Sequence, residues 1–498
     1  MTEHLPVLLI VIPLMAAPIF VLIRDRRMVL GCAITVCWIT FIGSLLLLNQ
    51  VTTPTDNAAS SVVSYHIGNW EPPWGIEYRV DALSAFVLVF VSFIGAAVIT
   101  FAAPSIEREI PRGKQYLFYA CYMLCLTGLL GIVITGDLFN VFVFLEISSL
   151  SSYALISLGR SRRSLMAAFQ YLVMGTIGAT FLLIGIGLIF QMTGTLNMLD
   201  ISERLTAQQS SRTILVAIAF VAVGVSIKTA LFPLHYWLPN AYTYAPSVVS
   251  AFIAATATKV SVYVLLRLMF TIFRPGFAFA QLPLDSKIMS FSLLGILVAS
   301  FVAMFQTNAK RLLAYSSVAQ IGYMLLGISF ASETGLVGGI AHMFNHALIK
   351  GGLFMAVACF ALRLGTVNID DLSGISKRMP WTSFAFVIGG LALIGVPLTA
   401  GFVSKWYLLV AAFDKGYWYV AALVLISSLM ALAYVWKIVE KMYFGELPES
   451  NAHVKEAPLT MLIPTYVVVG LTVVFGIWTT FPAGVARMAA LALLGSPS

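Results

Sequence analysis

Long apolar runs, separated by short polar clusters, fill this sequence almost from end to end. Most runs approach or exceed about 20 residues, the length that an α-helix needs to cross a bilayer. The end segment 482–495 is too short to span and is predicted to be an interfacial helix. The pattern predicts an all-α integral membrane protein with about fourteen transmembrane helices, at 5–23, 28–49, 81–103, 115–134, 138–158, 165–190, 213–235, 247–270, 287–306, 311–330, 335–362, 381–410, 417–442 and 457–480.

Composition and charge agree with this interpretation. Of the 498 residues, 60% are hydrophobic and only 10% are charged, whereas a soluble domain carries about 25% charged residues. The net charge of +8 does not indicate nucleic-acid binding, because Lys and Arg form short clusters between apolar runs. If the N-terminus lies outside, most of these clusters fall in the cytoplasm, including Lys310 and Arg311. The positive-inside rule therefore predicts both termini on the outer side.

Charged residues inside the predicted spans are the candidates for function. A charge at the bilayer centre costs about 2.5–3.5 kcal/mol on insertion scales, so each must be paired, hydrated or neutral. Such residues typically mark proton or cation paths. In this chain they are Glu146, Lys228, Lys259, Lys350 and Lys405.

Two further residues are weaker candidates. His235 lies close to the predicted cytoplasmic end of its span, where a structural hydrogen-bonding role explains it equally well. Asp137 follows Gly136 and fits a helix N-terminal cap, a place where an anion is favoured. We keep both as accessory candidates.

Two histidines and a lysine share one helix face. His342, His346 and Lys350 stand at i, i+4 and i+8, a spacing that places them in one row. Histidine titrates near neutral pH, and burial makes a lysine easier to deprotonate, so the row suits a proton relay. A zinc site is the alternative, but HMFNH lacks the glutamate of HExxH and no cysteine is near. The relay is the favoured interpretation, and no metal is predicted.

Helix breakers interrupt two of the predicted spans. Pro233 and Pro239 follow Lys228, and Pro397 precedes Lys405. Proline removes a backbone donor, and unwound backbone at membrane depth is tolerated only where protein or a watery cavity satisfies it. The breaks fall in spans seven and twelve, as expected if spans four to eight and nine to thirteen are two related units. Paired broken helices of this kind indicate the ion site of a transporter.

Four stretches carry a resemblance to a known family: GDLFNVFVFLEISSLSSYALISLG, KTALFPLHYWLPNAYTYAPSVVSAFIAATATKVSVYVLLR, AHMFNHALIKGGLFM and LIGVPLTAGFVSKW. They resemble the antiporter-like subunits of respiratory complex I, membrane-bound hydrogenases and Mrp-type Na⁺/H⁺ antiporters, over about residues 80–445. The resemblance implies two inverted five-helix repeats with broken helices seven and twelve. The expected division is N-terminal helices in 1–114, the repeats in 115–272 and 285–445, and a last helix and tail in 446–498.

The resemblance also implies roles for the buried charges. Glu146 and Lys228 match the family's charge pair, and Lys259 resembles the bridge toward the central axis. Lys405 matches the terminal group of span twelve. The histidine-bearing segment of span eleven matches the row His342, His346 and Lys350. Together these residues are expected to form a proton pathway.

DLFNVFVFLE and Lys405 look most like the D subunit of the Mrp type. This implies a multi-pass subunit of a bacterial cell (inner) membrane, assembled with Mrp A, B, C, E, F and G type subunits and acting on protons and Na⁺. The alternative is a proton-pumping subunit of a redox-driven complex. The chain shows no cysteine cluster, GxGxxG, haem-ligating or nucleotide-binding motif, so we expect no cofactor and no enzymatic reaction of its own.

Overall fold

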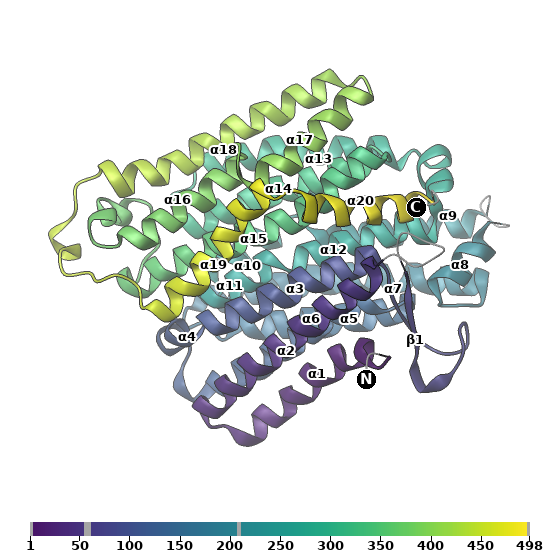
Figure 1. Ribbon diagram of the computed structural model, residues 1–498, viewed down its shortest axis with the longest axis horizontal. Helices are drawn as coiled ribbons and strands as arrows, with labels where there is room; N and C mark the ends of the chain where they lie inside the picture. Colours follow the sequence, from purple (N-terminus) through teal and green to yellow (C-terminus); the bar gives the residue numbers. More distant parts are fainter. Residues whose placement is uncertain (1–2, 54–60, 207–210, 496–498) are drawn as a thin grey trace.

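The computed structural model describes residues 3–53, 61–206 and 211–495, and most of its helices run along one common direction (Figure 1). Within these residues, 13 helices are long and apolar enough to cross a membrane. The helix pair α16 (Pro380–Ile394) and α17 (Ala400–Asp414) forms a further, broken span. The predicted all-α membrane fold is confirmed.

The first half of the chain forms α1 (Leu5–Ile23), α2 (Arg26–Thr52), a hairpin of β1 (Val63–His66) and β2 (Glu77–Val80), α3 (Ala82–Phe101), α4 (Ala103–Glu109), α5 (Gln115–Ile134), α6 (Leu138–Ser157), α7 (Arg162–Thr193), α8 (Met198–Leu205), α9 (Arg212–Thr229), α10 (Trp237–Tyr244), α11 (Ser247–Ala255) and α12 (Ala257–Leu266). The second half forms α13 (Leu284–Met304), α14 (Ala309–Ser329), α15 (Glu333–Leu364), α16, α17, α18 (Trp418–Phe444), α19 (Leu459–Ile477) and α20 (Thr480–Leu494).

Acidic caps set the start of three of these helices. Asp25, Asp81 and Asp137 accept a hydrogen bond from a backbone N–H in the first turn of α2, α3 and α6, at 2.9, 2.9 and 2.7 Å. Each cap satisfies a donor that has no partner within the helix. The starts agree with the predicted spans to within a few residues.

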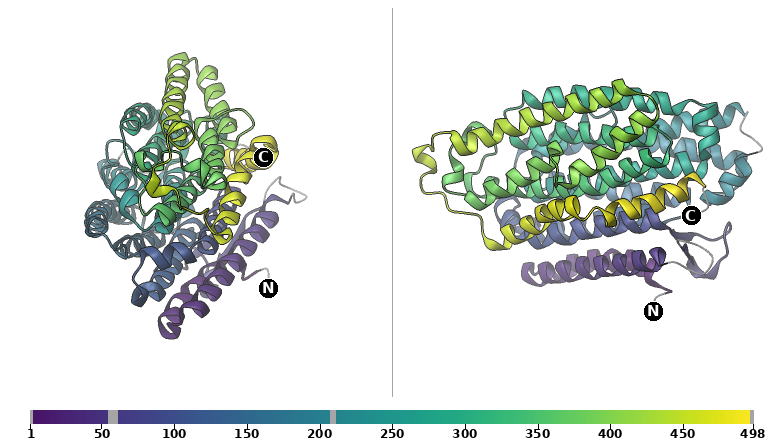
Figure 2. Two further views of the ribbon diagram at one scale, coloured as in Figure 1. Left: turned by 90° about the vertical axis from the view of Figure 1, so that its left-hand side faces the viewer. Right: turned by 45° about the horizontal axis from the view of Figure 1, so that its top comes forward.

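The helices divide into a buried centre and an apolar periphery. Helix α3 is buried along almost its whole length, and α14 and α15 are nearly as enclosed. The peripheral helices α1, α7 and α18 expose large apolar side chains such as Leu22, Phe169 and Leu429. Figure 2 shows α1 and α18 on opposite flanks of the bundle. A buried helix that is apolar all round and an apolar outer surface are what a bilayer environment requires.

Both predicted helix breaks are present. In span seven, α9 ends at Thr229 and α10 begins at Trp237, with Ala230 in the left-handed region between them. In span twelve, α16 ends at Ile394 and is followed by Gly395, whose φ of 88° favours glycine. Because α10 continues span seven, the predicted end at residue 235 was wrong, and His235 lies in the break.

Span eight is also interrupted, which the sequence did not predict. Helix α11 ends at Ala255 and α12 begins at Ala257, because Thr256 has non-helical dihedrals. The Thr256 hydroxyl donates to the carbonyl of Phe252 at 2.7 Å. Such back-bonding by threonine is known to bend helices. The last carbonyls of α11 are thereby left free within the core.

The last helix corrects the prediction of an interfacial helix at 482–495. Helix α20 packs lengthwise against α3 and α15, and α19 and α20 together run from one end of the bundle to the other (Figure 2). Small buried residues, Ala486, Ala489 and Ala490, allow this close packing. Helix α1 therefore begins, and α20 ends, at the same end of the bundle (Figure 1).

Candidate functional site

An ion pair joins the two residues predicted to pair. The Lys228 ammonium lies 3.2 Å from Oε1 of Glu146 on α6 and donates to the Ser149 hydroxyl at 2.9 Å. Lys228 is only 5% exposed. It stands in the last turn of α9, where the negative end of the helix dipole favours a cation. The break in span seven thus places a positive charge at a helix C-terminus inside the core.

A small polar cavity adjoins this pair. Its volume is about 20 Å³, and its lining includes Lys228 and the serines Ser148, Ser149, Ser152 and Ser261. A cavity of this size and polarity can hold about one water molecule. Ser261 belongs to α12, so the cavity extends from the ion pair to the helix that carries Lys259.

Lys259 lies across the break in span eight. It is fully buried in the first turn of α12, and its ammonium donates back to the carbonyl of Ala254 in α11. That carbonyl is free because α11 ends one residue later. The unexpected break therefore supplies the acceptor for a predicted site residue.

The two histidines of α15 are buried and lie one above the other. Their rings are 5.9 Å apart between centroids and nearly parallel, at 4°. His342 uses both ring nitrogens: Nδ1 lies 2.8 Å from the Ser404 hydroxyl and Nε2 lies 2.9 Å from Oε1 of Gln320. In the described part of the chain, neither nitrogen of His346 has a hydrogen-bond partner.

Lys350 turns toward the neighbouring helix α14. Its ammonium donates to the carbonyl of Leu313 at 2.8 Å and to the Ser316 hydroxyl. It is fully buried. His346 lies within electrostatic range of Lys350, and also of Lys259 and Lys405. The predicted row of three is therefore present on one helix and is adjoined by two further lysines.

Lys405 lies against the break in span twelve. Its ammonium donates to the carbonyl of Ile394 at 2.7 Å, to that of Leu393 at 3.3 Å and to the Ser428 hydroxyl at 3.1 Å. It also lies 5.0 Å from the ring centre of Tyr323, a cation–π contact. The same ring meets His342 edge-on at 5.6 Å. Tyr323 thus links the histidine row to Lys405.

The two accessory candidates have different surroundings. His235 is half-buried in the break of span seven and stacks on Phe232 at 5.3 Å. Asp137 caps α6 through the Asn140 N–H. Burial raises the pKa of Asp137 above its usual value, although the backbone hydrogen bonds act against this shift. Helix capping accounts for Asp137 without any part in transport.

Sequence reasoning did not identify the neutral partners of these charges. Ser149, Gln320, Tyr323 and Ser404 all contact a predicted site residue, but only Ser404 stands beside one in the sequence. Gln320, a polar residue in the apolar run 311–330, was the other available signal. Which residue it would meet depends on how α14 packs against α15, which the sequence does not show.

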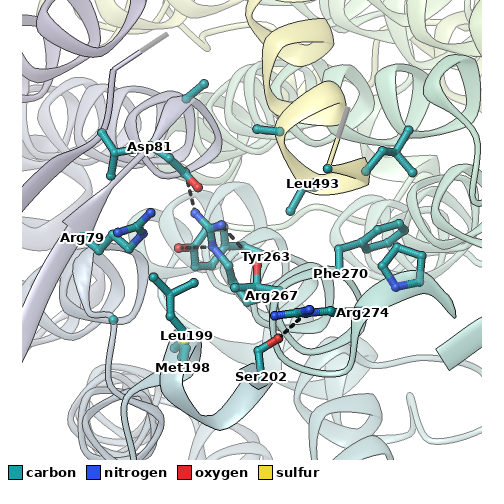
Figure 3. Close-up of a pocket in the computed structure, with 18 of the residues that line it drawn as sticks. Arg79, Asp81, Met198, Leu199, Ser202, Tyr263, Arg267, Phe270, Arg274 and Leu493 are labelled. Atoms are coloured by element: carbon teal, nitrogen blue, oxygen red, sulfur yellow. Dashed lines mark hydrogen bonds and ion pairs between the residues drawn. The ribbon is translucent and has the colours of Figure 1, made fainter. Parts of the chain in front are cut away.

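A second buried ion pair lies at the end of the bundle where α1 begins. Arg267 donates to Asp81 at 2.5 Å and to the hydroxyls of Ser84 and Tyr263 at 2.7 and 2.9 Å. The pair borders a cavity of about 520 Å³, in which Arg274 bonds to Ser202 (Figure 3). Arg267 lies within the predicted span 247–270, and the structure shows it buried near the end of that span.

The fold and these buried charges are those of an antiporter-like membrane subunit. The chain belongs to the NADH:quinone oxidoreductase/Mrp antiporter transmembrane family, whose pattern matches residues 135–477. It is 40% identical to the N subunit of the NADH-quinone oxidoreductase of Desulforudis audaxviator, with 96% of each chain covered. It is 30% identical to the D subunit of the Na⁺/H⁺ antiporter of Alkalihalophilus pseudofirmus, covering 95% of this chain and 94% of the relative.

Solved structures share the fold. The chain aligns with a chain of the Mrp complex from Dietzia sp. DQ12-45-1b at a TM-score of 0.89 and 24% identity, covering 99% and 97% of the two chains. It aligns with a chain of an archaeal membrane-bound sulfane sulfur reductase at a TM-score of 0.88 and 28% identity, covering 99% and 98%. The predicted family is thereby confirmed. The chain is a multi-pass membrane subunit of the complex I-like antiporter fold.

Proposed function

We propose that this chain is the proton-translocating subunit of a multisubunit Na⁺/H⁺ antiporter of the Mrp type. The observation that carries the proposal is a set of ionisable side chains within the spans, held mainly by neutral partners, that extends between the two broken spans; all are buried except Glu146, which is half-buried. Its members are Glu146, Lys228, Lys259, His342, His346, Lys350 and Lys405. The similarity to antiporter D subunits along nearly the whole chain supports the same assignment.

The hydrogen-bond acceptors of three of the lysines allow these side chains to gain and lose a proton. Lys259, Lys350 and Lys405 bond to carbonyl and hydroxyl oxygens, and only Lys228 forms an ion pair with a carboxylate. A buried ammonium next to a fixed carboxylate is held in its charged form. A buried lysine with neutral partners has no such constraint and can release its proton to a neighbour.

His342 has partners for both of its charge states. When it is neutral, Nε2–H donates to Gln320 and Nδ1 accepts from the Ser404 hydroxyl. When Nδ1 takes up a proton, it donates to that same oxygen, and the hydroxyl proton turns to the carbonyl of Gly401, 3.3 Å away. Only a hydroxyl rotation is needed, so this histidine can receive and pass on a proton without rearrangement of the helices.

The Glu146–Lys228 pair is the proposed control point. While it is closed, the two charges stabilise one another; when it opens, Lys228 presents an unpaired positive charge to the serine-lined cavity and α12. That charge repels a proton on Lys259 and favours its transfer toward the α15 row. Because the groups are coupled, protons are gained and lost by the set and not by single residues.

The proposed orientation, partner subunits and structural units follow from the same assignment. Both termini face the outside of a bacterial cell membrane, as the distribution of Lys and Arg favours. The chain assembles with Mrp A, B, C, E, F and G type subunits and has no catalytic reaction of its own. The structural units are the four predicted segments, with the repeats at 115–272 and 285–445.

A redox-driven complex is the second candidate. The 40% identity to the N subunit of an NADH-quinone oxidoreductase favours it. In that case the same residues move protons, and oxidation of a donor by a partner subunit supplies the energy.

The test separates the two sources of energy. The chain is purified with its co-expressed neighbouring subunits and reconstituted into vesicles, and proton movement is recorded after a Na⁺ pulse or after an electron donor with quinone. Na⁺-driven movement supports the Mrp type, and movement only with the donor supports the redox type. An assembled complex that moves no protons under either condition contradicts both.

A further inference from the structure

A buried lysine outside the proposed set lies at the opposite end of the bundle from the start of α1. Lys310, in the first turn of α14, is 5% exposed, and its ammonium donates to the carbonyl of Ala245 at 3.2 Å. The charge pattern places it among the cytoplasmic residues that set topology, and the structure shows that its side chain is buried. Its neighbour Arg311 is more exposed and lies 5.9 Å from the ring centre of Tyr315.

The Glu109 carboxylate lies near Lys310, because it accepts from the backbone N–H of Ser247, two residues beyond Ala245, whose carbonyl accepts from Lys310. Glu109 is the last residue of α4 and is partly exposed. Its two oxygens accept from the backbone N–H of Ser247, at 2.7 Å, and from the hydroxyl of Ser105, at 2.8 Å. Glu109 thus sits between solvent and the buried lysine, at the N-terminus of α11, where an anion is favoured.

Lys310 lies on the same helix as the residues of α14 that contact α15. These helices are antiparallel, and Gln320 meets His342 while Leu313 meets Lys350. Three residues separate Leu313 from Lys310, which is about 4.5 Å along the helix axis. Lys310 therefore stands about one helical turn from the residue that Lys350 contacts, on the side away from Gln320.

The surroundings do not explain Lys310 as a simple structural residue. One carbonyl is its hydrogen-bond acceptor within the described residues. A methionine of similar length would fill the same space without the cost of taking an ammonium out of water. Exchange of protons with a nearby carboxylate would explain why a lysine is buried at this position.

We propose that Glu109 and Lys310 form the inner mouth of the proton path. Glu109 exchanges protons with the cytoplasm, and Lys310 carries them between Glu109 and Lys350. Each transfer moves one proton from a donor to a neighbouring acceptor, with no other bond changed. This inference rests on the proposed function, because a mouth has a role only if the α15 row conducts protons.

Replacement of Lys310 by arginine separates a relay from a structural anchor. Arginine keeps a positive charge and a hydrogen-bond donor for Ala245, but it cannot release its proton. If Lys310 is a relay, Lys310→Arg lowers the rate of proton movement at least about tenfold, because a positioned proton-transfer group contributes about 10²–10⁴ to a rate. If Lys310 is only an anchor, Lys310→Arg transports normally.

The measurement uses the whole complex in everted vesicles, with the initial rate of Na⁺-driven or donor-driven proton movement normalised to the assembled subunit. Arg311→Gln is the matched control and is expected to keep the wild-type rate. Glu109→Gln keeps an oxygen for the Ser247 N–H and loses the charge. It is expected to slow transport at least about threefold and to weaken the dependence of the rate on the pH at the cytoplasmic face.

The outcomes separate this inference from the proposed function. Normal transport by Lys310→Arg and Glu109→Gln, with loss in Lys259→Gln, overturns the inner mouth alone. Normal transport by Lys259→Gln as well overturns the proposed function. If Lys310→Arg fails to assemble, the transport rate and pH profile of Glu109→Gln decide whether the inner mouth exists. A wild-type rate and pH profile in Glu109→Gln then overturns the inference.

Discussion

Replacing Glu146 by glutamine removes the negative charge that faces Lys228 while keeping an oxygen in the same place. The Lys228 ammonium and Oε1 of Glu146 are 3.2 Å apart. At an effective dielectric constant of about 20, two unit charges at that distance attract by about 5 kcal/mol. The glutamine oxygen still accepts a hydrogen bond from the ammonium, worth about 1.5–3 kcal/mol.

The difference between the ion-pair attraction and the remaining hydrogen bond gives the size of the effect on Lys228. Lys228 loses about 2–3.5 kcal/mol of stabilisation of its charged form, a roughly 30- to 400-fold change in the balance between ammonium and amine. A pair that can no longer form cannot be opened to drive the next transfer. We therefore expect the rate of coupled proton movement to fall at least about tenfold, at a normal level of assembled protein.

The assay is the initial rate of proton movement in vesicles, with the amount of complex measured on the same membranes. Glu203→Gln, on exposed α8, is the matched control, because it removes a carboxylate that faces solvent. It should leave the rate unchanged. The reasoning is refuted if Glu146→Gln assembles normally and transports within about twofold of the wild type, since a control point cannot be that dispensable.

Three further variants test other parts of the site. Lys405→Arg keeps a charge beside the freed carbonyls of α16 but cannot release a proton; vesicle assays should show loss of transport, and a normal rate would exclude Lys405 from the path. Asp81→Asn leaves Arg267 without its anion, which should cost about 3–5 kcal/mol of stability. Burial opposes ionisation of Asp81, but Arg267 prevails and lowers its pKa to about 2. The stabilisation is therefore present above the usual aspartate pKa and is lost as the pH falls from about 4 toward 2. The thermal-stability advantage of wild type over Asp81→Asn should shrink across that range, and a constant difference would contradict it. Gly401→Ala places a Cβ atom on the carbonyl oxygen of Ala392; it should lower stability by about 1–3 kcal/mol, and an unchanged melting temperature would contradict the close packing of α16 and α17.

Much of the fold could be predicted because the bilayer imposes strong rules on sequence. Apolar runs of sufficient length predicted the spans, and Pro233 and Pro397 predicted the breaks in spans seven and twelve. Charges such as Lys259 and Lys405 were conspicuous because nearly everything around them is apolar. These features depend on local composition, which the sequence shows directly.

The features that were missed depend on tertiary contacts. The break at Thr256 involves neither glycine nor proline, and a threonine within an apolar run is not by itself a signal. The shortness of the apolar segment that forms α20 predicted an interfacial helix and did not show that it packs against α3 and α15. Lys310 and Arg311 are alike in sequence, yet one is buried and the other is more exposed. Such differences arise from how helices far apart in the sequence pack together.

The roles of the buried residues as proton carriers are still predictions. The structure brings His342 together with Tyr323 and Ser404, and Lys228 together with Glu146. Contact shows that transfer is geometrically possible for these groups.

Lys259 offers the sharpest test of whether protons pass along the buried side chains. It stands between the Glu146–Lys228 pair and the α15 row. Its ammonium is held by a carbonyl and a hydroxyl, with no carboxylate partner among the described residues. The chain is expressed with its neighbouring genes in an antiporter-deficient host, and everted vesicles are prepared. Proton movement is then measured when it is driven by Na⁺, by Li⁺ or, in parallel, by an electron donor. We expect proton movement in the wild type and its loss in Lys259→Gln at equal abundance. Equal proton movement by wild type and Lys259→Gln would contradict it.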